Sequence, residues 1–255
     1  MPDYELKGDL NMRSEPDPEV ERRPQRIPKT YEDIETIIAT CRNPETADEL
    51  NGLRRDGRLK VIGLDVDDDE SIGRAFEEVK DLVRGNGLNL LVNNVGILLP
   101  YEVDGPICRK TMLKQLETNS VSPAIVTQTF LPLLKIAAAC VHGEEVSVQR
   151  SAIINISSTM ASIEKNDGCF TGPMTVYRMS KSALNSFSRQ SFMELSKYRI
   201  LVVAFCPGWV RTDMGGPNAE LEVNESARTL VANIFRLDSR ENGLYFDRFL
   251  HPIPN

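Results

Sequence analysis

Residues 88–96 read LNLLVNNVG, a short apolar run that ends in two asparagines and a glycine. The run is too short for an ordinary helix, and its apolar residues do not alternate with polar ones. It is typical of a parallel strand that is buried on both faces and ends in a turn. Similar runs occur at 36–40 (TIIAT), 59–66 (LKVIGLDV), 151–157 (SAIINIS), 200–206 (ILVVAFC) and 243–247 (GLYFD).

Amphipathic stretches with helical spacing separate these six candidate strands. The alternation predicts a single α/β domain with a doubly wound parallel sheet of the Rossmann type. Asn43 followed by Pro44 is typical of a helix start. Pro123 and Pro132 are expected to interrupt or kink the long third helix, because proline lacks the amide donor. The helical patterns cover 44–56, 70–84, 110–141, 174–198 and 224–237.

The composition is that of an ordinary globular protein, with 255 residues of which 41% are hydrophobic and 26% charged. The net charge of −7 provides no basic footprint for nucleic acid. Five cysteines without a CxxC pair argue against a disulfide framework or a zinc site and suit the reduced thiols of a cytoplasmic protein. The sequence has only two histidines, so hydrolysis with a histidine base and metal binding by several histidines are both disfavoured. No secretory leader or membrane-spanning run is evident, so we expect no metal and no membrane partner.

Residues 1–33 differ from the rest of the chain in texture. They are dense in charge, hold five of the fifteen prolines, and lack the continuous apolar run of a buried strand. Such a segment has too little apolar surface to form a core. We therefore expect a disordered or irregular segment over 1–33 and a folded domain over 34–255.

Candidate chemistry lies on one predicted helix and one strand end. Tyr177 and Lys181 are four residues apart, so they share a helix face. A nearby ammonium favours the phenolate of a tyrosine whose free pKa is about 10, which makes the phenol a usable acid near neutral pH. Ser158 follows the strand 151–157, on the side where parallel sheets bind ligands. Each signal is weak alone, because serine also commonly satisfies backbone groups in turns.

Together and in this order, the motifs resemble the short-chain dehydrogenase/reductase family over roughly residues 34–250. ATCRNPE, INISS and PGWVRTDMGG are most similar to the sniffer-type and C-factor-like carbonyl reductases. The resemblance rests on Arg42 after a strand, Asp65-Val66, NNVG at 93–96, Asn119, INISS ending at Ser158, YRMSK at 177–181 and PGWVRTDM at 207–214.

The resemblance implies an oxidoreductase that uses NADP(H) to reduce an aldehyde or ketone. Tyr177 would donate the proton, and Ser158 would hydrogen-bond the reacting oxygen. Lys181 would lower the pKa of Tyr177 and hold the nicotinamide ribose, and Asn119 would support a proton-relay water. The cofactor residues implied are Arg42, Asp65, Val66, Asn93, Asn94, Gly96, Tyr177, Lys181, Pro207, Gly208, Val210 and Thr212.

Arg42 bears on the choice of cofactor. A guanidinium after this strand can make paired contacts with a ribose 2′-phosphate, which favours NADP(H) over NAD(H). The alternative is a solvated surface arginine near a helix start. The resemblance also leaves a homo-oligomer as one expectation, because relatives commonly associate through the helices that correspond to 110–141 and 174–198.

One part of the family pattern is missing. The family begins with a strand and a TGxxxGxG turn that receives the cofactor pyrophosphate, and no such spacing occurs before Tyr31. We therefore expect an incomplete Rossmann-type domain without its first βα unit. The missing strand would lie between the strands at 36–40 and 88–96 and would leave two inner edges. Either these strands pair directly, or the N-terminal segment fills the slot poorly, or the protein is unstable.

Weak dinucleotide binding and low stability would follow. The rival interpretation is therefore a catalytically impaired or inactive relative with weak or no cofactor binding. A hydrolase built on serine, tyrosine and lysine is a distant third, because no GxSxG elbow occurs. The sequence does not specify which small carbonyl compound would be the substrate.

Overall fold

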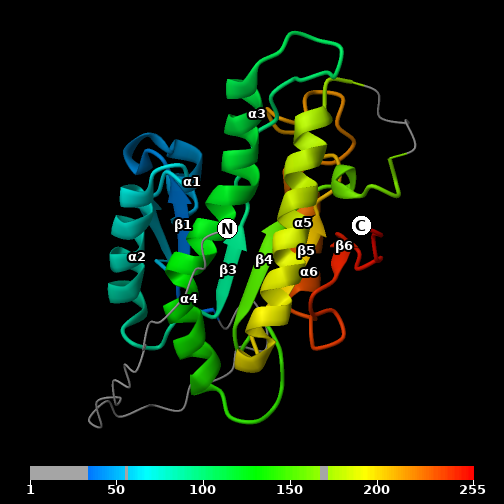
Figure 1. The fold of residues 1–255 in the computed structure, drawn as a ribbon. Helices are drawn as coiled ribbons and strands as arrows, with labels where there is room; N and C mark the ends of the chain where they lie inside the picture. Colours follow the sequence, from blue (N-terminus) through cyan, green and yellow to red (C-terminus); the bar gives the residue numbers. More distant parts are fainter. Residues whose placement is uncertain (1–33, 55–56, 167–171) are drawn as a thin grey trace, which may run out of the picture.

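The computed structural model describes residues 34–54, 57–166 and 172–255 (Figure 1). The expectation for residues 1–33 lies outside the described residues. All strand pairs are parallel, as predicted, and every predicted strand is present with slightly different ends. The strands are β1 (Ile37–Cys41), β2 (Leu59–Gly63), β3 (Leu90–Asn93), β4 (Ala152–Ile156), β5 (Leu201–Cys206) and β6 (Tyr245–Asp247).

The helices connect successive strands as crossovers. Asp68 begins the second α-helix by accepting a hydrogen bond from Glu70 N at 3.1 Å. The α-helices are α1 (Asp48–Gly52), α2 (Asp69–Val83), α3 (Arg109–Leu116), α4 (Ser122–Cys140), α5 (Thr175–Leu195) and α6 (Val223–Ile234). A π-helical turn, η4 (Glu117–Val121), joins α3 to α4, and short 3-10 turns are η2 (Pro44–Thr46), η5 (Thr159–Ala161) and η6 (Ser196–Tyr198).

The expected interruption of the long third helix occurs next to Pro123, where the π-helical turn η4 separates α3 from α4, but not at Pro132. Pro123 lies in the first turn of α4, and the helix runs through Pro132 to Cys140. Core packing explains this, because Phe130 and Leu134 on either side of Pro132 are both buried. The stretch Arg109–Cys140 is also long and apolar enough to cross a membrane by length and composition alone, which the sequence analysis did not anticipate. Here its apolar side chains form core contacts with the sheet and α2.

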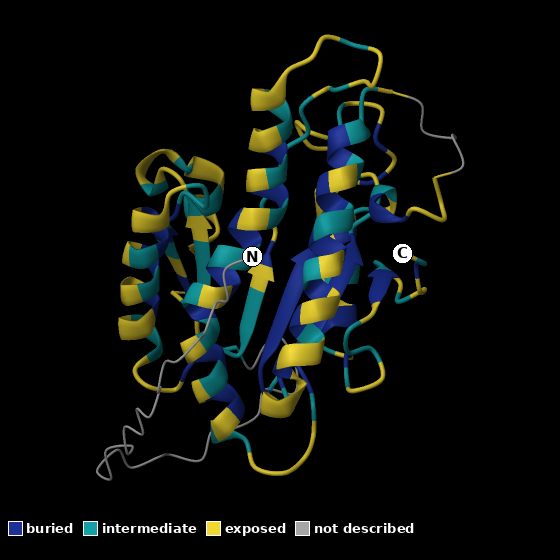
Figure 2. Ribbon diagram, viewed as in Figure 1, coloured by how far each residue is buried: buried dark blue, intermediate teal, exposed yellow. Residues whose placement is uncertain are grey.

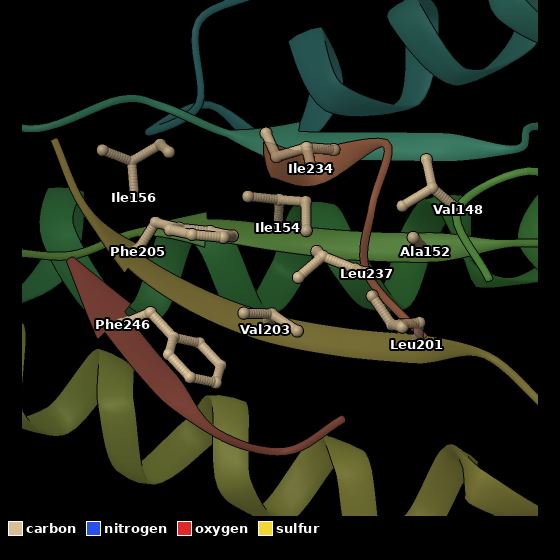
Figure 3. Close-up of a cluster of buried hydrophobic side chains, with 10 residues drawn as sticks. All are labelled: Val148, Ala152, Ile154, Ile156, Leu201, Val203, Phe205, Ile234, Leu237 and Phe246. Atoms are coloured by element: carbon tan, nitrogen blue, oxygen red, sulfur yellow. The ribbon is translucent and has the colours of Figure 1, made fainter. Parts of the chain in front are cut away.

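The core forms two layers, one on each face of the sheet. On one face, alternate residues of β4 and β5 pack against Ile234 and Leu237 from α6 and the segment after it, as Figure 3 shows. On the other face, Ile153 and Val202 pack against α4 and α5. Both strands are buried along their whole length, which explains why their sequences read as unbroken apolar runs.

The described strands form two separate sheets rather than one. Hydrogen bonds join β1 to β2 in one sheet and β3, β4, β5 and β6, in that order, in the other. The small sheet is held to the rest by α2 packing on α4. Figure 2 shows that β1 and β3 are less buried than β4 and β5. Direct pairing of the two inner strands, one of the three outcomes considered, does not occur.

Candidate active site

Three of the predicted catalytic side chains meet at the carboxyl end of the sheet. Ser158 follows β4, and its hydroxyl accepts a hydrogen bond from Met160 N at 3.2 Å, which starts η5. Tyr177 and Lys181 lie one turn apart on the buried face of α5. The Ser158 side chain is near enough to the Tyr177 hydroxyl to lower the Tyr177 pKa. Lys181 Nζ donates to the Ile156 carbonyl at 2.8 Å. The sequence pattern therefore identified groups that are neighbours in space.

The electrostatics of this group differ from the expectation. Burial raises the pKa of Tyr177, and the Ser158 side chain offsets only part of that rise. The expected lowering by Lys181 is not found, because its Nζ lies 6.0 Å from the Tyr177 ring centroid and is bonded to a carbonyl. Burial lowers the pKa of Lys181 to about 8. At neutral pH the phenol is therefore protonated and can donate a proton, but it is a weaker acid than the spacing of Tyr177 and Lys181 predicted.

Asn119, the fourth predicted catalytic residue, lies in the π-helical turn η4, a feature that often marks functional sites. The side-chain amide of Asn119 makes two hydrogen bonds to the main chain of Ile97, in the loop after β3. Nδ2 donates to the Ile97 carbonyl at 2.8 Å, and Oδ1 accepts from the Ile97 N–H at 2.7 Å. Nδ2 also donates to Ser180 Oγ at 2.9 Å. The side chain therefore positions the loop after β3 against α5, and the relay water stays a prediction.

A cavity of about 2300 Å³ extends between β1 and β3 to the loop after β3. Gly96 borders its inner end, where an added Cβ would lie 3.4 Å from Lys181 Nζ and 3.5 Å from Asn119 Oδ1. Glycine therefore keeps space beside the lysine. Six of the predicted cofactor residues line this cavity: Arg42, Asp65, Val66, Asn93, Asn94 and Gly96.

Some of these side chains are used inside the fold. Asn93 is buried and its Nδ2 donates to Thr127 Oγ1 at 3.0 Å and to Asn155 Oδ1 at 2.7 Å. Its side-chain amide therefore joins α4 to β4, while the residue also lines the cavity. Asp65 Oδ1 accepts from Asp67 N at 3.1 Å and shapes the turn after β2. Arg42 is exposed at the end of β1.

Of the six other predicted cofactor residues, Tyr177 and Lys181 lie on α5 outside the cavity lining, and the turn after β5 holds four. The Pro207 carbonyl accepts a hydrogen bond from Ser226 Oγ at 2.8 Å, and Val210 forms an isolated parallel β-bridge with Leu221. Gly208 has a φ of +86°, and a Cβ there would lie 2.6 Å from Leu221 Cδ1, so only glycine fits. Thr212 Oγ1 accepts from Gly215 N at 3.1 Å. These four residues do not line the cavity between β1 and β3.

Two further residues near the site were not anticipated. Tyr245, the first residue of β6, donates its hydroxyl hydrogen bond to the Ser158 carbonyl, and burial raises its pKa. Cys206 Sγ, at the end of β5, lies 3.1 Å from Thr159 Oγ1. In the sequence both read as ordinary core residues of apolar strands. The position of Cys206 at the carboxyl end of its strand was an available signal, whereas Tyr245 lies at the amino end of β6 and offered none. Within residues 34–54, 57–166 and 172–255, no group of three metal-ligating side chains is present.

Solved structures share this fold closely. The carbonyl reductase Sniffer of D. melanogaster is 34% identical, with a TM-score of 0.82 over 87% of this chain and 88% of that one. The NADPH-bound carbonyl reductase from chicken fatty liver is 36% identical, with a TM-score of 0.83 over 87% and 84% of the two chains. Both similarities agree with the sniffer-type resemblance of the sequence.

Curated relatives show the same ancestry. The C-signal protein of Myxococcus xanthus is 31% identical over 160 residues, which cover 63% of this chain and 88% of that protein. This chain spans between 44% and 66% of the length of seven other curated relatives. The profile of the short chain dehydrogenase family matches residues 31–222, which is well over half of the chain. With that match and the shared fold, the chain belongs to the short-chain dehydrogenase family.

Proposed function

We propose that this protein is an NADP(H)-dependent reductase that converts an aldehyde or ketone to an alcohol, with Tyr177 as the proton donor. The observation that carries the proposal is the buried phenol of Tyr177, grouped with Ser158 after β4 and with Lys181 one turn away on α5. The similarity to the NADPH-bound chicken carbonyl reductase supports it. We further propose a small-molecule substrate and a cytoplasmic location.

The residues of the cavity fit a nicotinamide dinucleotide at two points. The space kept by Gly96 beside Lys181 suits a ribose, because the Lys181 ammonium has three donors and Ile156 accepts only one. The exposed guanidinium of Arg42, at the other side of the cavity, suits a 2′-phosphate. When bound, NADPH supplies the hydride.

The protein's own groups then polarise the carbonyl and deliver the proton. The Ser158 hydroxyl donates a hydrogen bond to the carbonyl oxygen, and the Tyr177 hydroxyl transfers its proton to the same oxygen as negative charge develops. Lys181 is assigned the nicotinamide ribose rather than the tyrosinate, because its Nζ lies 6.0 Å from the Tyr177 ring centroid. Tyr177 and Lys181 are both buried, so little water screens the interactions that their polar groups make with the substrate and the cofactor.

Tyr177→Phe tests the proposal, with Tyr198→Phe as a matched control at an exposed tyrosine. We expect the control to keep full activity and Tyr177→Phe to lose about 10²- to 10⁴-fold in kcat for aldehyde or ketone reduction, the usual contribution of a general acid. NADPH binding by Tyr177→Phe should change little. Full turnover by a folded Tyr177→Phe protein would refute the assignment.

A second candidate is a chain with impaired or absent cofactor binding, which the division of the described strands into two sheets favours. Fluorescence separates the two candidates. Trp209 is the single tryptophan, follows Gly208 in the turn after β5, and is 43% exposed. Bound NADPH should quench its emission and gain fluorescence of its own. No change at saturating NADPH would favour the second candidate.

A further inference from the structure

The inner edges of β1 and β3 carry main-chain groups that face the part of the cavity between the two strands, called the slot below, whereas Arg42 and Gly96 lie beyond the carboxyl ends of these strands. Ile37 N donates to Arg58 O at 3.0 Å, toward β2, so the next residue along β1 points its main chain the other way. The carbonyl of Asn89 accepts from Ala152 N at 2.7 Å, which sets the same alternation in β3. The residues whose N–H and C=O groups face the slot are therefore Ile38, Thr40, Leu90 and Val92.

None of these four residues has a main-chain partner in the part of the chain that the structure describes. Figures 1 and 2 show that β1 and β3 point in the same direction on either side of the slot. Unpaired strand edges favour the addition of another strand, which would satisfy both rows of groups at once. The slot is thus suited to one extended segment.

The two faces of the slot differ in polarity. On the side of α4, buried Val126 and Phe130 line the slot, and Ile38 packs into the same apolar cluster. On the opposite face, Ile37 is 40% exposed and Val92 is 42% exposed. A strand that fits here needs one apolar face for α4 and one polar face for solvent. It does not need the continuous apolar run of a strand that is buried on both faces.

Residues 4–12, YELKGDLNM, have this pattern. Tyr4, Leu6, Leu10 and Met12 fall on one side of an extended chain, with Gly8 among them, and Glu5, Lys7, Asp9 and Asn11 fall on the other. Period-two alternation without proline is typical of a half-buried strand. We propose that residues 4–12 add to the sheet as a parallel strand between β1 and β3, with the apolar side on α4.

The chain between this segment and β1 has the length and composition that the connection needs. Ile34, where the described chain begins, lines the same slot, so residues 13–33 form the connection. A parallel crossover requires a dozen or more residues, and this one has 21. Fully extended it would reach about 70 Å, more than twice the roughly 30 Å of a nine-residue strand. Pro16, Pro18, Pro24 and Pro28 all fall in the connection, where no ladder hydrogen bond is lost.

Amide hydrogen exchange of the full chain, resolved by residue, tests the proposal directly. We expect the amides of residues 5–11 and the slot-facing amides of β1 and β3 to exchange at least a hundredfold more slowly than in an unstructured chain. Exchange of residues 5–11 at the unstructured rate would overturn the proposal, whatever any variant does. Protection that rises with protein concentration would also overturn it, because the added strand would then come from a second copy.

Two matched double variants test the orientation of the strand. Leu6→Asp with Leu10→Asp places two carboxylates against α4 and should reduce protection at the slot-facing amides of β1 and β3 at least tenfold. Lys7→Asp with Asn11→Asp introduces the same two side chains on the solvent face and should leave that protection unchanged. Buried Ile154 and Val203 serve as internal references. If the two double variants reduced amide protection equally, the proposed orientation of the strand would be overturned.

Discussion

The Asp67 carboxylate joins the loop after β2 to the helical layer, so its replacement measures how firmly the small sheet is held. Oδ2 accepts hydrogen bonds from Lys114 Nζ and Thr118 Oγ1, both at 2.7 Å, and Oδ1 accepts from Ser122 Oγ at 2.5 Å. The side chain is only 16% exposed. Asp67→Asn keeps the shape and one carbonyl oxygen but removes the charge and turns an NH₂ group toward one of these donors.

The expected loss follows from these contacts. Hydrogen bonds to a charged group contribute about 1.5–3 kcal/mol each, and the variant loses at least one of three and weakens the others. We expect unfolding free energy to fall by about 3 kcal/mol, a decrease in Tm of about 6–12 °C. Burial opposes ionisation of Asp67, but the hydrogen bonds from Lys114, Ser122 and Thr118 outweigh it and hold the pKa of the carboxyl below its ordinary value.

The pH dependence has a definite sign. Because the folded pKa lies below the unfolded value of about 3.9, the stabilisation is fully present above that value and is lost as pH falls through the folded pKa. Urea unfolding at pH 7, 5 and 3 should therefore show the full difference between wild type and Asp67→Asn at the first two values and a smaller one at pH 3. Asp81→Asn, at an exposed position on α2, is the control. Equal stability of wild type and variant at pH 7, or a gap that persists unchanged at pH 3, would refute the reasoning.

Four further variants test local features. Gly85 has a φ of +81° and open space around it, so Gly85→Ala should lower the free energy of unfolding by about 1–2 kcal/mol. Gly87→Ala should lower it by about 1–3 kcal/mol more, because the new Cβ would lie 2.4 Å from Ala137 N. Equal losses for the two variants in urea unfolding would contradict the clash at Gly87. The buried guanidinium of Arg150 donates hydrogen bonds to five main-chain carbonyls. Lysine has only three donors, so Arg150→Lys should lower the free energy of unfolding by about 2 kcal/mol or more. An unchanged Tm would contradict this prediction. Tyr245→Phe removes the donor to the Ser158 carbonyl and should lower kcat about tenfold with KM for NADPH unchanged. An equal rise in KM, or no change in kcat, would show that Tyr245 does not position Ser158.

Local pattern was sufficient for the strands because a parallel strand between two helical layers must be apolar on both faces, as β4 and β5 are. Their ends were less predictable. The run at 59–66 reads as one strand, yet β2 ends at Gly63 and the next residues form the turn toward α2. The continuity of α4 through Pro132 depends on packing by residues from other elements, which a local proline rule does not include.

The candidate site was predictable where chemistry is encoded at short spacing, as for Tyr177 and Lys181. It was less so where contacts join distant parts of the chain. Lys114 and Asp67 are 47 residues apart, and Tyr245 and Ser158 are 87 apart, so no local window contains either pair. The pKa of Tyr177 depends on its burial, and helix spacing alone predicted the opposite direction.

The wide turn η4 between α3 and α4 makes the length of this helix as important as its composition. Before the turn, Gln115 bonds to the main chain of Leu99, and within it Asn119 bonds to Ile97, whereas Phe130 beyond it faces the core. Each residue of an α-helix advances about 100° around the axis. Deleting a single residue from α4 between this turn and Phe130 would rotate Gln115 by about that angle relative to Phe130. Insertions and deletions here should therefore be far more damaging than substitutions, because no side-chain change can restore the lost phase.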